Sequence, residues 1–405
     1  MADLRPSRAL RYRDAAGPLG DLIAPPYDVI TDADREALLA RSPHNAVRLE
    51  LPDEPYEAVA ELMAAWERDG VLTRDDRPGI TAWTQTFTLD GVTRERRTLL
   101  GTVGLEPYEA RVVRPHERTH AGPKEGRLRL YRAVKTHISP VFGLYPDPEG
   151  AVWAAAGVAG PPDAEFASDG GDVLNRVWWI DDPARLDAVT AAMDGRWILI
   201  ADGHHRYETA LNYQREVREA NGGQAGPWDR VLMGVSALDD PGLVVLPTHR
   251  VLSRWPADGA SRLDATPVAG LDALLDALEA APDDVPTLGL VTADGMRVLT
   301  LPGAAGDTPA ARLDVAVLER EVLIPDLGED QAALSHHGVL TYVKDAREAA
   351  GLVAGGEAAA VFIVRPIPKA SVAAVSEAGE TMPQKSTYFF PKLLTGVAFH
   401  PLTDA

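Results

Sequence analysis

Residues 197–211 read WILIADGHHRYETAL, a short apolar run that turns sharply into a helical pattern. The turn carries Asp202, Gly203, His204, His205 and Arg206 in consecutive positions. A helix N-terminus presents backbone N–H groups and the positive end of the helix dipole, so it attracts anions. Two histidines and an arginine strengthen that attraction. The sequence therefore predicts a strand, a phosphate-binding corner and a helix, in that order.

Asp202 is the exception in this corner, because it places a negative charge where a phosphate is expected. A carboxylate there is better explained as a base or as a ligand of Mg²⁺ than as part of an anion cradle. The structural alternative is that Asp202 caps the helix and the two histidines are buried and hydrogen-bonded. Zinc is a weaker alternative, since adjacent histidines point in different directions, unlike a helical pair four residues apart.

Composition limits the class of protein. The chain has 405 residues, which predicts two or three domains, and its 45% hydrophobic and 25% charged residues are usual for a globular protein. It has no cysteine, which excludes disulfides and thiolate chemistry. No apolar run approaches the length of a membrane span, and residues 1–6 contain no apolar signal segment, so we expect a cytoplasmic protein without a membrane partner. The net charge of −20 argues against long nucleic acid as a partner.

Residues 111–135 are a local exception to the acidic character, with eight basic and two acidic residues and a net charge of +6. This basic island points to a small anionic ligand, or else to a solvated helix face whose acids come from other segments. Within it, His116 and Glu117 follow a proline, and Glu117 is a candidate base or merely a balancing charge. Lys124 follows a glycine-proline loop suited to phosphate contact. Two weaker signals are residues 247–250 and the Lys385-Ser386-Thr387 run.

The periodicity predicts a mixed α/β chain in three segments. Residues 1–105 are expected to form an N-terminal α/β extension, with helices at 32–41 and 56–69, a hairpin of strands at 79–89 and 92–101, and a non-helical stretch at 24–30. Residues 106–255 are the expected core, with helices at 124–136 and 204–220 and strands at 138–145, 177–181, 197–201, 231–238 and 243–246. Residues 256–405 are expected to form a C-terminal α/β domain with helices at 271–280, 310–322 and 346–350, and strands at 287–291, 296–301 and 359–364. Its apolar tail, 382–393, is expected to pack back toward the active site.

Several of these motifs together resemble a prokaryotic family known as domain of unknown function 1015. The resemblance rests on four stretches that occur in order along nearly the whole chain: residues 24–29 (APPYDV), 121–124 (AGPK), 201–210 (ADGHHRYETA) and 385–392 (KSTYFFPK).

That family is similar to the nucleotide-dependent free-serine kinases, which implies a ParB/sulfiredoxin-like core. In those kinases a Pro-His-Glu segment supplies a catalytic glutamate, which matches Glu117. Their Asp-Gly-His-His-Arg turn holds phosphates and includes a catalytic aspartate, which matches Asp202. Their late Lys-Thr-Thr segment matches Lys385, Ser386 and Thr387. The chain departs from them in its N-terminal extension, and in carrying Tyr388-Phe389-Phe390 where the kinases have basic residues.

The resemblance therefore implies a nucleotide-dependent phosphotransferase that acts on a small hydroxyl-containing metabolite, such as free serine. The expected catalytic residues are Glu117 and Asp202. His116, Lys124 and residues 203–206 are expected to bind the phosphates of ADP or ATP, with Mg²⁺ as cofactor, and residues 385–387 to bind substrate or phosphate. Two alternatives stay open: a nucleotide-binding switch, and a hydrolase of nucleotides or small phosphoesters. The residues do not fix the oligomeric state.

Overall fold

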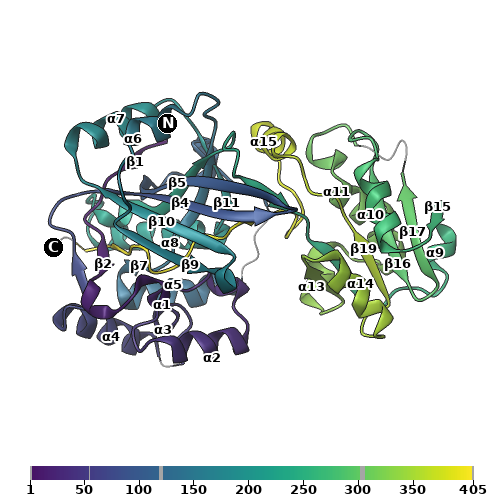
Figure 1. Ribbon diagram of the computed structural model, residues 1–405, viewed down its shortest axis with the longest axis horizontal. Helices are drawn as coiled ribbons and strands as arrows, with labels where there is room; N and C mark the ends of the chain where they lie inside the picture. Colours follow the sequence, from purple (N-terminus) through teal and green to yellow (C-terminus); the bar gives the residue numbers. More distant parts are fainter. Residues whose placement is uncertain (1, 54, 118–121, 302–305, 404–405) are drawn as a thin grey trace. The chain divides into compact units, whose positions relative to one another are not determined.

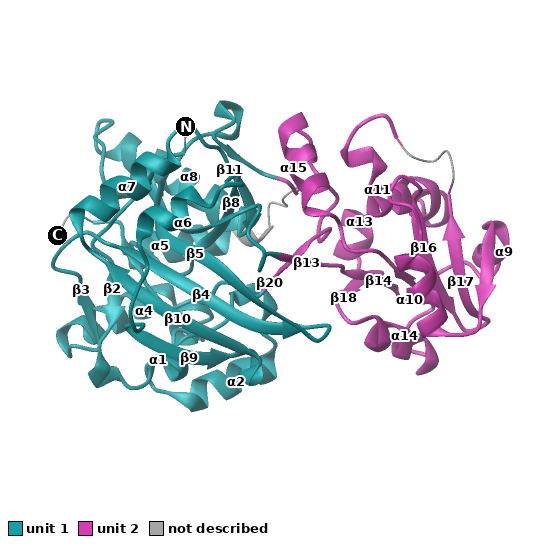
Figure 2. Cartoon of the chain, turned by 45° about the horizontal axis from the view of Figure 1, so that its top comes forward, with its two compact units in different colours: residues 1–115, 119–243, 391–405 teal, residues 116–118, 244–390 magenta. Residues whose placement is uncertain are grey.

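The computed structural model describes residues 2–53, 55–117, 122–301 and 306–403, with residues 122–124 described by backbone alone (Figure 1). The chain forms two compact units (Figure 2). Unit 1 comprises Met1–Pro115, Thr119–Leu243 and Pro391–Ala405, and unit 2 comprises His116–Arg118 and Val244–Phe390. The mixed α/β class predicted from the sequence is confirmed. Within the described ranges, no helix has both the length and the apolar character needed to cross a membrane.

Unit 1 is built on a mixed sheet with the strand order β6-β11-β8-β12-β5-β4-β10-β9, and β1 also pairs with β5. Its β6–β11 and β8–β12 neighbours are parallel, and the other pairs are antiparallel. The strands are β1 (Leu4–Arg5), β4 (Ile80–Leu89), β5 (Val92–Gly104), β6 (Val113–Arg114), β8 (Val141–Tyr145), β9 (Ala164–Ser168), β10 (Val173–Ile180), β11 (Ile198–Asp202) and β12 (Arg230–Ala237). The sheet thus draws strands from both of the segments expected at 1–105 and 106–255.

Helices and short strand pairs complete unit 1. The helices are α1 (Leu19–Leu22), α2 (Asp32–Arg41), α3 (Val47–Glu50), α4 (Tyr56–Arg68), α5 (Gly122–Val134), α6 (Ala151–Ala156), α7 (Pro183–Met193) and α8 (His204–Ala220). The 3₁₀ turns are η1 (Asp14–Ala16), η2 (Tyr27–Val29), η3 (Tyr108–Ala110), η4 (Asp169–Gly171) and η5 (Pro227–Asp229). Strands β2 (Leu10–Tyr12) and β3 (Leu72–Arg74) pair, as do β7 (Thr136–His137) and β21 (His400–Pro401).

Local sequence explains several of these elements. Helix α2 begins after Thr31, whose hydroxyl accepts the Asp34 N–H while the Asp34 carboxylate accepts the Thr31 N–H, a capping box. Helix α4 buries Val59, Met63 and Trp66, which share one face at helical spacing. The expectation that residues 24–30 contain no helix was wrong in one detail, because η2 forms a single 3₁₀ turn directly after Pro26. Proline fits the position that precedes such a turn.

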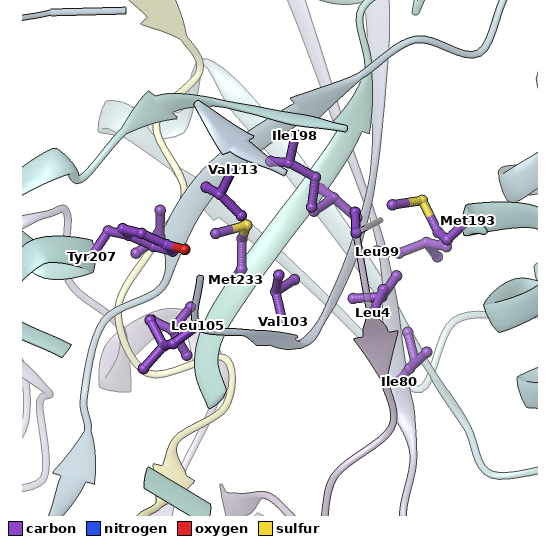
Figure 3. Close-up of a cluster of buried hydrophobic side chains, with 14 of the residues drawn as sticks. Leu4, Ile80, Leu99, Val103, Leu105, Val113, Met193, Ile198, Tyr207 and Met233 are labelled. Atoms are coloured by element: carbon purple, nitrogen blue, oxygen red, sulfur yellow. The ribbon is translucent and has the colours of Figure 1, made fainter. Parts of the chain in front are cut away.

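The core of unit 1 anchors both sides of the predicted phosphate corner. Ile198 on β11 and Tyr207 on α8 belong to the same cluster of buried apolar side chains, together with Val113 and Met233 (Figure 3). Ile198 and Tyr207 are fully buried. Because the strand before the turn and the helix after it pack into one core, the turn between them is held in place.

Unit 2 contains an antiparallel sheet with the order β15-β17-β16-β19-β14-β18, and a separate pair, β13 with β20. The strands are β13 (Val244–Leu246), β14 (His249–Leu252), β15 (Ala265–Val268), β16 (Thr287–Thr292), β17 (Gly295–Thr300), β18 (Leu340–Val343), β19 (Ala360–Ile363) and β20 (Tyr388–Phe390). The helices are α9 (Gly259–Arg262), α10 (Leu271–Glu279), η6 (Ala310–Arg312), α11 (Asp314–Leu318), the π-helical η7 (Glu319–Leu323), α12 (Ile324–Leu327), α13 (Gln331–His336), α14 (Ala346–Ala354) and α15 (Lys369–Ala378).

The expectation of a single helix at 310–322 was wrong, because Leu313 adopts an extended backbone and separates η6 from α11. Leu313 is buried, so the break between the two helices places this side chain in the protein interior rather than in solvent. The other helices expected in this part of the chain are present.

Candidate phosphate-binding corner

The corner predicted at residues 202–206 joins β11 directly to α8. Gly203 forms the joint with φ 87° and ψ 31°, in the left-handed region that favours glycine. A side chain at this position would also place its Cβ 2.9 Å from Nε of Arg206. Helix α8 begins at His204 without a side-chain cap. The glycine therefore permits the sharp turn and leaves room for the arginine, and the first turn of a long helix follows at once.

Two cations contact the Asp202 carboxylate. Nζ of Lys392 lies 2.7 Å from Oδ1, and Arg206 pairs with Oδ2 while also donating to the carbonyl oxygen of Pro140. The three charged side chains are only 4–16% exposed. Burial opposes the charge of Arg206, but attraction to Asp202, and further to Asp28, outweighs it and raises the pKa of this guanidinium. Asp202 thus orients cations, and the capping role offered as its structural alternative is not seen, because α8 has no side-chain cap.

A third cation, Arg96, is close enough to the same carboxylate for their charges to interact. Arg96 is fully buried on β5, donates to the side-chain oxygen of Gln85, and lies 4.6 Å from the ring centroid of Phe142. Phe142 is the residue paired with Asp202 between β8 and β11. Burial lowers the pKa of Arg96 to about 9, although Asp240 and Asp202 favour its charge. The corner therefore gathers positive charge from α8, β5 and the C-terminal segment.

Sequence reasoning missed Lys392 and Arg96. Lys392 ends the KSTYFFPK motif, so the sequence carries a signal, but the Lys-Thr-Thr segment of the kinases corresponds to Lys385. Arg96 lies in a continuous polar run of β5, residues 93–98, in which nothing distinguishes it from its neighbours. Only the pairing of β5, β12 and β8 places it beside the corner.

Within unit 2, residues 385–387 wrap around Glu117. Its Oε2 accepts the Lys385 N–H at 3.3 Å, and its Oε1 accepts the N–H groups of Ser386 at 3.2 Å and Thr387 at 3.4 Å. Oε1 also accepts the Thr387 hydroxyl at 3.3 Å. Lys385 has φ 56°, and successive N–H groups that converge in this way form an anion-binding nest. In this structure the carboxylate of Glu117 is the anion in that nest.

Neighbouring side chains fix the nest. His116 is fully buried, and its Nε2 lies 2.8 Å from the Thr387 hydroxyl. The Thr248 hydroxyl donates to the carbonyl oxygen of Lys385. Arg250 is also fully buried. Its Nε donates a hydrogen bond to Oε1 of Gln331 at 3.0 Å, and its positive charge interacts with the charge of Glu117. The predicted residues His116, Glu117 and 385–387 thus come together in unit 2, and the weaker signal at residues 247–250 supports them.

Two arginines of the basic island pair with acids from other segments of unit 1, as its structural alternative predicts for them. Arg127 pairs with Glu50 at 3.2 Å, and Arg132 pairs with Glu216 at 2.6 Å. The backbone of Lys124 lies in α5, but its side chain lies outside the description. The loop residues before it, 118–121, also lie outside the described residues.

The described residues contain no group of three or more histidine, aspartate or glutamate side chains arranged to hold a metal ion. Asp202, the expected Mg²⁺ ligand, already contacts Lys392 and Arg206. Adjacent positive charges disfavour a divalent cation at that carboxylate, so the arrangement does not fit Asp202 as a metal ligand.

A comparison with family models matches residues 4–316 to the family described as protein of unknown function, DUF1015. The chain belongs to this family. The match runs through the corner of the DUF1015 chain and ends before the 385–387 nest. A comparison with curated proteins finds no match.

Solved structures similar to the DUF1015 chain share little of its sequence. A conserved hypothetical protein from Pyrococcus furiosus is 14% identical, with a TM-score of 0.38 over 73% of this chain and 92% of that one. A free serine kinase in complex with AMP is 15% identical, with a TM-score of 0.40 over 74% and 91%. SbnI with C-terminal truncation, from Staphylococcus aureus, is 13% identical, with a TM-score of 0.39 over 75% and 87%.

Proposed function

We propose that this protein is a nucleotide-dependent phosphotransferase whose unit 1 corner binds the phosphates. One observation carries the proposal: a glycine turn leads into an uncapped helix while Arg206 and Lys392 converge on Asp202. Helix N-termini favour anions, and buried cations bind phosphate oxygens more strongly than exposed ones. The order of the sequence motifs supports the same reading.

In the proposed reaction, the acceptor hydroxyl attacks a phosphorus atom of the nucleotide. A new O–P bond forms, the bond from phosphorus to the bridging oxygen breaks, and the shortened nucleotide leaves with that oxygen. Glu117 or Asp202 receives the hydroxyl proton, a role that rests on the sequence resemblance. Arg206 and Lys392 balance the charge that moves onto the leaving oxygen. ADP and ATP are both candidate donors.

Direct assay of phosphate transfer tests this proposal. Purified protein is incubated with ATP or ADP and small alcohols, including free serine, and products are followed by phosphorus NMR. We expect a phosphorylated alcohol from the wild type. Asp202→Asn and Glu117→Gln should each keep the fold, and loss of the residue that acts as base should lower turnover by about 10²–10⁴-fold.

The matched control is Asp187→Asn, which changes an exposed aspartate on α7 and should leave turnover unchanged. Nucleotide binding without any transfer would favour the switch instead. Release of inorganic phosphate without an alcohol product would favour the hydrolase. Full activity in both Asp202→Asn and Glu117→Gln would refute the assignment of the base.

A further inference from the structure

A buried side-chain amide connects the sheet of unit 1 to the segment that carries Lys392. Gln85 on β4 is fully buried. Its Oε1 accepts a hydrogen bond from Nη2 of Arg96, and its Nε2 donates to the backbone carbonyl oxygen of Lys392 at 3.2 Å. Gln85 and Arg96 occupy paired positions on β4 and β5. One residue of the N-terminal part of the chain therefore holds the backbone of a residue 307 positions later.

The two partners of Gln85 together require an amide. The guanidinium of Arg96 can only donate hydrogen bonds, and the carbonyl oxygen of Lys392 can only accept them. Glutamine offers an oxygen to the first and an NH₂ group to the second. A glutamate would offer acceptors to both partners, and a methionine would offer neither of them a comparable group. The identity of this residue is thus matched to both contacts at once.

The backbone that Gln85 holds belongs to a cation of the phosphate-binding corner. Nζ of Lys392 lies 2.7 Å from Oδ1 of Asp202, and the Lys392 side chain is 10% exposed. The next residue, Leu393, packs closely against β12, where a Cβ added to Gly234 would lie 2.5 Å from its Cδ1. A lysine ammonium is carried on a flexible stem, so its position depends on where the backbone is fixed. The sheet fixes that backbone at two successive residues.

This arrangement is not the one that stability alone would favour. Arg96 is fully buried, and within the described part of the chain its Nε and Nη1 have no hydrogen-bond partner. Burying donors without acceptors costs free energy, and the cost is larger for a charged group. Replacing such buried groups with well-packed apolar residues is often neutral or stabilising. The Gln85–Arg96 pair is therefore better explained by the contact that it provides to Lys392.

We infer that Gln85 is a positioning residue of the phosphate-binding corner. It fixes the backbone of Lys392 so that the ammonium group can contact the nucleotide phosphates, and Arg96 sets the orientation of the Gln85 amide. Gln85 itself contacts neither the nucleotide nor the reacting atoms. This inference rests on the proposed function and deepens it, because it gives the N-terminal segment, residues 1–105, a part in nucleotide binding.

A double-mutant cycle on ADP affinity, measured by calorimetric titration, tests the inference. The four proteins are the wild type, Gln85→Met, Lys392→Met and the double variant. Lys392→Met removes a charged contact and should weaken ADP binding about tenfold. Gln85→Met should weaken it about three- to tenfold on its own and have little effect in the Lys392→Met background. A merely structural role would weaken ADP binding equally in both backgrounds.

A second variant keeps the test decisive if Gln85→Met does not fold. Gln85→Glu keeps an acceptor for Arg96 but lacks the donor to Lys392, so its effect should depend on Lys392 in the same way. Gln224→Met, at an exposed position, is the matched control and should leave ADP affinity unchanged. The inference is overturned if the folded Gln85 variant or Lys392→Met binds ADP as the wild type does, or if the loss caused by the Gln85 variant is the same in both backgrounds. If the wild type itself does not bind ADP, the phosphate-binding corner is refuted, and the inference fails with it.

Discussion

At the scale of single residues, two separate constraints favour glycine at the position of Gly203. Its φ of 87° disfavours any side chain, and a Cβ there would lie 2.9 Å from Nε of Arg206. Gly203→Ala should lower the free energy of unfolding by about 1–2 kcal/mol from the backbone alone. The contact should also displace Arg206 and weaken ADP binding. Chemical denaturation and calorimetry measure the two effects.

Gly222→Ala is a matched control for this substitution. Gly222 has φ 74°, but a Cβ there would meet nothing within 4 Å. It should show the backbone cost alone and leave ADP affinity unchanged. Equal ADP affinity in the two alanine variants would contradict this prediction, because it would show that ADP binding by Arg206 does not need the space left by Gly203.

Residue-level inference from the sequence succeeded where the chemistry is local. Asp202 to Arg206 are consecutive, so their shared turn was visible as a motif. Lys392 and Gln85 were not recognised, because each meets its partners only after distant segments fold together: Lys392 reaches Asp202, and Gln85 reaches the carbonyl oxygen of Lys392.

At the scale of elements, we expect the small β7–β21 pair to make the stability of unit 1 sensitive to acid. His137 and His400 occupy paired positions, with ring centroids 5.6 Å apart. Burial lowers the pKa of His400 to about 4, although its hydrogen bond to the Pro227 carbonyl opposes the shift. Burial, and then His400, lower the pKa of His137 well below 6.5. The folded pair therefore stays neutral over a pH range in which the unfolded histidines bind protons.

Because the folded pKa is depressed, His400 contributes stability above pH 6.5 and loses it as the pH falls toward 4. The free energy of unfolding should drop by up to about 3 kcal/mol across this window on account of His400. Denaturant titrations at several pH values measure the drop. His400→Phe should flatten the profile, while the exposed His336→Phe should not. A slope that His400→Phe leaves unchanged would contradict this account.

Helices were easier to predict than strand partners. The bounds of α2 and α8 matched the prediction, since capping residues and the glycines after residue 221 mark their ends locally. Strand β14 and the pair β13–β20 join residues far apart in the sequence, and no local signal encodes such pairing.

At the scale of the whole molecule, the chain forms two units, and each unit combines segments that lie far apart in the sequence. Residues 391–405 belong to unit 1, and residues 116–118 to unit 2. A segment-by-segment reading of composition cannot detect such returns of the chain, because composition does not tell which distant segments pack together. The candidate residues are accordingly divided: Asp202 to Arg206 and Lys392 lie in unit 1, and Glu117 and residues 385–387 in unit 2.

The central claim is that the corner between β11 and α8 holds the phosphates of a nucleotide. A crystal structure of the protein grown with ADP tests it most directly. We expect phosphate oxygens at about 3 Å from backbone nitrogens of the first turn of α8 and from the side chains of Arg206 or Lys392. Density for ADP elsewhere on the chain, with the corner occupied only by its own side chains, would contradict the account.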